Sequence, residues 1–125
     1  MRIIKTLAMF VAPLLSFLGV DFLISNLIKA GKLKFSKESE KKYTEIESEY
    51  KQKLISWAKK RGINIKNPNR REKDLLKKEL EIVESEALDK FIDYLKANRR
   101  KRDIKILLIG TEFVKIVNEH IKNRL

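Results

Sequence analysis

The side chains that could carry out acid–base or metal chemistry are few in this chain. His120 is the single histidine, it lies beside Glu119, and no Glu-x-x-His spacing leads to it. The absence of cysteine excludes disulfides, iron–sulfur clusters, cysteine-type zinc sites and a cysteine nucleophile. No glycine-rich phosphate-binding motif occurs either. We therefore expect no catalytic residue, no metal site and no cofactor, and we interpret His120 as a surface side chain of a terminal helix.

The acidic residues in the middle of the chain alternate with apolar positions, which is typical of a solvated helix face. They are Glu79, Glu81, Glu84, Glu86, Asp89 and Asp93. A paired-carboxylate active site would need two of them in one pocket, and nothing in their spacing predicts a pocket. The expectation is that the protein is not an enzyme.

Basic residues are the more informative feature. The chain has 29 Lys and Arg against 17 Asp and Glu, a formal charge of +12. Three runs at expected helix ends are candidate sites for anionic, phosphate-bearing partners: Lys59, Lys60 and Arg61; Arg70 and Arg71; Arg99, Arg100, Lys101 and Arg102. Lipid headgroups and nucleic acid both fit. Alternatively these cations only cap and solvate helices, since cations are favourable at helix C-termini. No motif for reading base sequence accompanies them.

The elements that would position these charges begin with an apolar head. Residues 7–28 contain one charged side chain, Asp21, and basic residues flank them on both sides. A transmembrane helix needs about 20 mostly apolar residues, so we interpret residues 1–34 as a membrane anchor. Two alternatives remain: a helix buried in a soluble core or against a partner, and a cleaved signal peptide, for which no small-x-small site follows the apolar run.

Asp21 is costly inside a bilayer, and Asn26 adds a second polar group. Together they predict a contact with another membrane subunit. More Lys and Arg lie just after the head than before it, so the positive-inside rule predicts a single-pass protein with a cytoplasmic C-terminal body.

Residues 35–125 read as a basic helical body. Ser36 can cap a first helix over about 37–61, whose apolar stripe is a candidate partner or core face: Tyr43, Ile46, Tyr50, Leu54 and Trp57. Gly62 can end this helix in the left-handed conformation. Asn67 and Pro68 would then start a second helix over about 69–98. Its stripe contains Leu76, Leu80, Val83, Ala87, Phe91 and Leu95, widened by Leu75, Leu88 and Ile92.

The last segment is ambiguous. Ile106, Ile109, Phe113, Val117 and Ile121 fit one face of a helix over about 104–123. Residues 104–109, followed by Gly110, could instead be a short buried strand, with Thr111 capping a final helix. We favour the single helix.

The predicted fold is therefore all-α: an N-terminal apolar helix that we expect to be transmembrane, a long amphipathic helical hairpin and a C-terminal helix. The function that fits best is a non-enzymatic, membrane-anchored accessory or scaffold subunit of a larger assembly. Its partners would be the lipid bilayer, protein subunits and an anionic lipid or nucleic acid. The alternatives are a basic nucleic-acid-binding or virion- or ribosome-type structural protein, and a single-span lysis or envelope-bridging protein.

Overall fold

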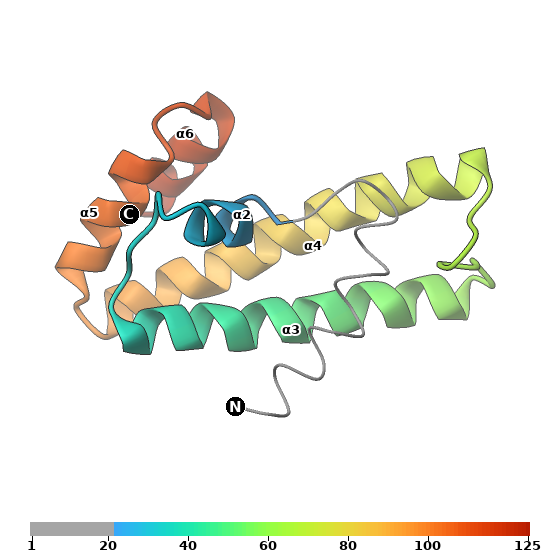
Figure 1. Cartoon of the computed structure of the whole chain (residues 1–125), viewed down its shortest axis with the longest axis horizontal. Helices are drawn as coiled ribbons and strands as arrows, with labels where there is room; N and C mark the ends of the chain where they lie inside the picture. Colours follow the sequence, from blue (N-terminus) through green and yellow to red (C-terminus); the bar gives the residue numbers. More distant parts are fainter. Residues whose placement is uncertain (1–21) are drawn as a thin grey trace. The chain divides into compact units, whose positions relative to one another are not determined.

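The computed structural model describes residues 22–125, and these residues form five α-helices and no strand (Figure 1). The helices are α2 (Leu23–Lys29), α3 (Lys37–Lys60), α4 (Arg70–Ala97), α5 (Lys101–Gly110) and α6 (Lys115–Arg124). The prediction of an all-α fold is confirmed for this part of the chain. Its residues fall into two compact units: unit 1 is Thr44–Ala87, and unit 2 combines Phe22–Tyr43 with Leu88–Leu125.

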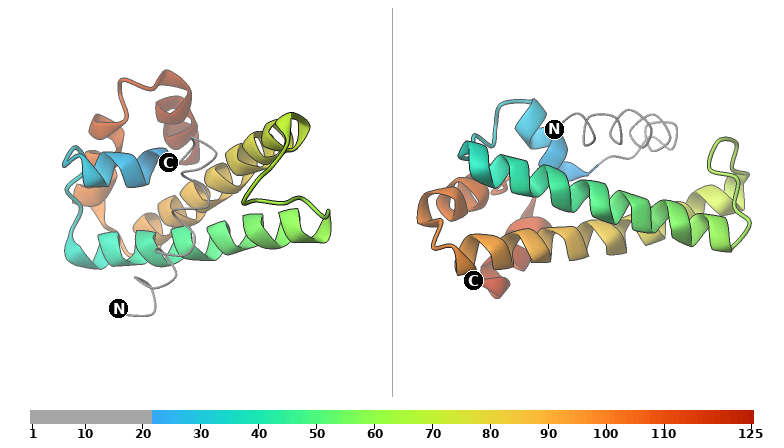
Figure 2. Two further views of the ribbon diagram at one scale, coloured as in Figure 1. Left: turned by 45° about the vertical axis from the view of Figure 1, so that its right-hand side comes forward. Right: turned by 90° about the horizontal axis from the view of Figure 1, so that it is seen from below.

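Unit 1 is a hairpin made of the later part of α3, a loop, and the earlier part of α4. The two stretches run in opposite directions on either side of the loop (Figures 1 and 2). Its buried apolar side chains follow the predicted stripes: Ile46, Tyr50 and Leu54 on α3, with Leu76, Leu80, Val83 and Ala87 on α4. Trp57 is only half-buried, and Leu75 is exposed because it lies at the edge of the apolar face of α4.

The loop of unit 1 is defined by two helix ends. At the end of α3, the Gly62 amide donates to the Lys59 carbonyl and the Ile63 amide to the Ala58 carbonyl, which is the Schellman arrangement. Gly62 has φ +67°, a conformation that glycine adopts at little cost.

The start of α4 differs from the predicted cap at Asn67 and Pro68. The Asn69 side chain accepts from the Glu72 amide (2.8 Å), and the Glu72 carboxylate accepts from the Asn69 amide (2.9 Å). This reciprocal capping box satisfies two backbone amides at once. The predicted cap, Asn67 followed by Pro68, could satisfy only one. The helix therefore begins at Arg70, and Pro68 is buried in the loop.

Unit 2 has an aromatic centre. The ring of Phe91 on α4 is fully buried and makes edge contacts with Phe35 (centroids 5.3 Å apart) and Tyr43 (5.2 Å). Tyr94 stacks beside it at 6.4 Å. Such pairs add about 0.5–1.5 kcal/mol each beyond the burial of apolar area.

The end of the predicted apolar head differs from the expectation, because residues 23–29 form a separate short helix, α2. Phe22 is extended, with φ −66° and ψ 131°, so no continuous helix runs through it, and α2 ends at a second Schellman turn at Gly31. Phe22, Ile24 and Leu27 belong to unit 2 and are buried. Packing in a protein core, unlike crossing a bilayer, does not need a helix of about 20 residues. Among the described residues, no helix has the length and apolar character to cross a membrane. Residues 1–21, with most of the expected anchor, lie outside the described part.

The C-terminal segment forms two helices where one was predicted (Figure 2). The strand alternative for residues 104–109 is wrong, since they lie within α5. The break follows from side-chain hydrogen bonds to the carbonyls of the last turn of α5. The Thr111 hydroxyl donates to the Leu107 carbonyl (2.7 Å) and the Asn118 amide group to the Leu108 carbonyl (2.8 Å), so the helix ends without an exposed, unpaired terminus.

Contacts with α4 and with the segment after α2 hold these two helices in unit 2. His120 Nε2 lies 2.5 Å from an Asp89 carboxylate oxygen, and Arg124 pairs with both Asp89 (3.3 Å) and Asp93 (3.1 Å). Asp89, Asp93 and His120 were predicted on the solvent side of their helices; all three side chains are partly exposed, and they also join α6 to α4. Gly110 packs so closely on Leu33 that a Cβ at this position would overlap the leucine side chain.

Candidate anion-binding surface

The turn between α4 and α5, in unit 2, carries the densest positive charge among the predicted site residues. Five cationic side chains line one recess of about 440 Å³, and we call them the α4–α5 cluster: Lys34, Arg99, Arg100, Lys101 and Arg102. Phe35, Ser36 and Asp103 complete its lining. Lys34 comes from the segment between α2 and α3, so the fold adds a cation that the predicted run of four did not include.

The cluster is only partly neutralised. Arg100 forms an ion pair with Glu38 on the first turn of α3, and this hydrogen bond and charge raise the pKa of Arg100 above its ordinary value. Within residues 22–125, no carboxylate lies within ion-pair distance of the other four cations: Lys34, Arg99, Lys101 and Arg102. Four of the five positive charges are therefore free to attract an anion.

Asp103 also lines the recess, but its carboxylate already accepts hydrogen bonds from uncharged donors. Its carboxylate accepts hydrogen bonds from the Ser36 amide (3.0 Å), the Ser36 hydroxyl (2.8 Å) and the Ser39 hydroxyl (2.6 Å). Burial, the largest influence, raises the pKa of Asp103, but the bonds from Ser39 and Ser36 and the charge of Arg100 outweigh it and hold the pKa below its usual value. The carboxylate is a structural tie at the base of the recess.

Arg99 has an unusual backbone. Its φ is +52°, and it is the one non-glycine residue with positive φ in the described chain. It occupies the same position as Gly31 and Gly62 in a Schellman turn, since its amide donates to the Lys96 carbonyl and the next amide, of Arg100, donates to the Leu95 carbonyl. A side chain in this conformation costs about 1–2 kcal/mol.

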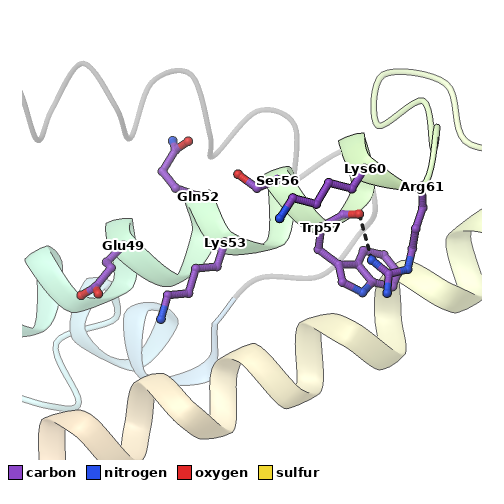
Figure 3. A pocket seen from close by; sticks show the side chains of 7 residues that line it. All are labelled: Glu49, Gln52, Lys53, Ser56, Trp57, Lys60 and Arg61. Atoms are coloured by element: carbon purple, nitrogen blue, oxygen red, sulfur yellow. Dashed lines mark hydrogen bonds between the residues drawn. The ribbon is translucent and has the colours of Figure 1, made fainter.

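The other basic runs gather in unit 1, on either side of the loop. Lys60 and Arg61 line a recess of about 370 Å³ together with Trp57 and Lys53 (Figure 3). The Arg61 guanidinium lies 4.5 Å from the Trp57 ring centroid and donates to the Trp57 carbonyl (3.3 Å), which occupies part of its hydrogen-bonding capacity.

The remaining predicted residues are not part of these recesses. Lys59 is exposed on the last turn of α3, and Arg70 and Arg71 are exposed at the start of α4. Of the two predicted membrane-subunit contacts, Asn26 is exposed on α2 and Asp21 lies outside the described residues. On the predicted partner or core face, Tyr43, Ile46, Tyr50 and Leu54 are buried.

Sequence reasoning missed the polar half of the α4–α5 site: Ser36 was expected only as a helix cap, and Ser39 and Asp103 were not singled out. One signal could have identified Asp103, because it is the single acidic residue directly after four cations. Residues 22–125 contain no group of histidine and carboxylate side chains arranged to hold a metal ion.

Comparisons with known proteins give no relative: no family model, curated protein or solved structure matches this chain.

Proposed function

We propose that this protein is a non-enzymatic helical accessory or scaffold subunit of a larger assembly, held at an anionic membrane surface through lipid phosphates bound by the α4–α5 cluster. The observation that carries the proposal is the set of four unpaired cations around one recess. Cations near an anionic leaflet contribute about 1 kcal/mol each. Arginine is suited to this role because its guanidinium can donate two parallel hydrogen bonds to one phosphate.

The N-terminal apolar segment supports this attachment but is a weak anchor by itself. Because residues 22–28 belong to unit 2, the uncharged run that remains between Lys5 and Asp21 is 15 residues long. As a helix it would extend about 22 Å, less than the roughly 30 Å of hydrocarbon in a bilayer. We therefore propose that the segment and the α4–α5 cluster act together.

Limited trypsin digestion of the full chain in nanodiscs tests the proposal. Trypsin cleaves after residues 99–102, so a bound lipid surface should slow this cleavage several-fold in discs that contain phosphatidylserine compared with phosphatidylcholine alone. Residues 59–61 of the same chain are the internal control, since they lie outside the cluster. High salt should abolish the protection, because it screens exposed charges. Equal cleavage of residues 99–102 in both kinds of disc would overturn the proposal.

Nucleic-acid binding is a second candidate, and one observation favours it. Trp57 and Arg61 lie together beside Lys53 and Lys60, and aromatic rings with cations are typical of surfaces that stack single-stranded bases. If an oligonucleotide protected residues 59–61 from trypsin while anionic discs left residues 99–102 open, this candidate would replace the membrane proposal.

A further inference from the structure

The corner between α5 and α6 exposes three large apolar side chains within eight residues. Ile109 is 59% exposed, Phe113 64% and Ile116 84%. Scattered single apolar residues are normal on protein surfaces, but a contiguous group commonly marks a contact site. Each of the three residues therefore keeps more than half of its surface exposed.

The corner is held in place by buried hydrogen bonds. Thr111 and Asn118 are both buried, and the Asn118 amide group donates to the Thr111 hydroxyl (3.2 Å) in addition to the Leu108 carbonyl. These bonds fix the end of α5 against the start of α6. The three apolar side chains are therefore presented by an ordered turn, which lowers the entropic cost of inserting them into an apolar environment.

Cations outnumber carboxylates on the two helices that form the apolar corner. Lys32 Nζ lies 5.4 Å from the centre of the Phe113 ring, which places its charge against the ring face. Arg124 is paired with Asp89 and Asp93. The other exposed cations of α5 and α6 are Lys101, Arg102, Lys105, Lys115 and Lys122, and the exposed carboxylates from Lys101 to Leu125 are Glu112 and Glu119. The excess of positive charge complements an anionic surface.

Helix α5 links this corner directly to the α4–α5 cluster. It begins at Lys101, within the recess, and ends at Gly110, so its ten residues extend over about 15 Å. Apolar side chains beside cations on short helices are typical of segments that lie in a membrane interface rather than across it.

We propose that the α5–α6 corner inserts Ile109, Phe113 and Ile116 into the interface of an anionic bilayer. This inference rests on the proposed function and adds an apolar contact to the electrostatic one. The bilayer is favoured as the occupant because the apolar group is small, carries a cation against its aromatic ring and continues into the surface proposed to bind lipid phosphate.

A single-cysteine label in the full chain tests the insertion, since the protein has no cysteine of its own. Ile116→Cys carries an environment-sensitive fluorophore, and Lys122→Cys is the matched control, about 120° around the same helix. In nanodiscs with phosphatidylserine, we expect a blue shift and quenching by nitroxide lipids at position 116 only. Phe113→Ser in the labelled Ile116→Cys chain should lower the insertion constant by about tenfold, from the loss of one aromatic side chain.

The other outcomes separate this inference from the proposed function. A water-exposed label at position 116, with residues 99–102 still protected from trypsin, would overturn only the insertion. A water-exposed label at position 116 together with unprotected residues 99–102 would overturn both the insertion and the proposed function. A blue shift that grows with protein concentration without lipid would identify self-association as the use of this corner and would also overturn the insertion.

Discussion

Arg99 combines an unfavourable backbone with a useful side chain. Schellman turns end α2, α3 and α4, and the left-handed position is glycine in the first two but arginine in the third. Glycine would be the better residue for stability, since it has no Cβ to clash in this conformation. Arginine at this position therefore lowers stability while adding a cation to the recess.

Replacing Arg99 with glycine should therefore stabilise the fold and weaken the site. We expect Arg99→Gly to raise the free energy of unfolding by about 1 kcal/mol, measured by urea denaturation. The same variant should lose part of the protection of residues 100–102 in anionic nanodiscs.

Gly62→Arg is the matched control in the opposite direction. No atom lies within 4 Å of the position that its Cβ would take, so the cost should come from φ alone and should lower stability by about 1 kcal/mol. A destabilised Arg99→Gly protein would contradict this account of the turn.

Asp103 determines how the first turns of α3 and α5 meet. It lies on the first turn of α5, and its partners are Ser36, which precedes α3, and Ser39 within it. Each hydrogen bond to a charged group contributes about 1.5–3 kcal/mol, and a carboxylate left without its partners would be costly in this buried place. The tie keeps Lys34 next to residues 99–102.

Stability should accordingly depend on pH through Asp103. Because its pKa is lower in the folded than in the unfolded state, its contribution is present above the ordinary aspartate pKa, about 3.9, and is lost as the pH falls through the folded value. Asp103→Asn should reduce the free energy of unfolding at pH 7 by roughly 1–3 kcal/mol.

The pH dependence identifies the carboxylate as the cause. Between about pH 5 and pH 2, the native protein should lose more stability than Asp103→Asn, as followed by urea denaturation at each pH. Ser39→Ala, which removes the shortest of the three bonds, should give an intermediate loss at pH 7. Parallel pH curves for the native protein and Asp103→Asn would show that Asp103 does not supply this stability.

For the chain as a whole, charge and the apolar N-terminal segment together predict how the protein is held. Alkaline carbonate should leave the full chain in the membrane pellet if residues 1–21 enter the bilayer, whereas high salt alone should release a chain held only by its cations. In sealed membranes, protease should reach the body from the cytoplasmic side, as the distribution of Lys and Arg predicts. Release of the protein by salt alone would contradict a role for the N-terminal segment.

Local patterns in the sequence were enough to predict the helical class, the apolar stripes of α3 and α4 and the glycine turn at Gly62. These features depend on residues within about four positions of one another, where periodicity and capping act directly. The same reasoning placed the N-cap of α4 two residues early, at Asn67 instead of Asn69, because both are plausible caps and only Asn69 with Glu72 satisfies two amides.

Tertiary structure was needed wherever a side chain finds its partner far along the chain. Asp103 binds Ser39 and Ser36 across 64 and 67 positions. The apolar residues 22–28 resemble the end of a membrane span in sequence, since hydropathy does not distinguish a bilayer from a protein core; the fold places Phe22, Ile24 and Leu27 in unit 2. Local propensity decides which helices form. The partners of buried polar and apolar groups depend on which distant segments of the chain pack against one another.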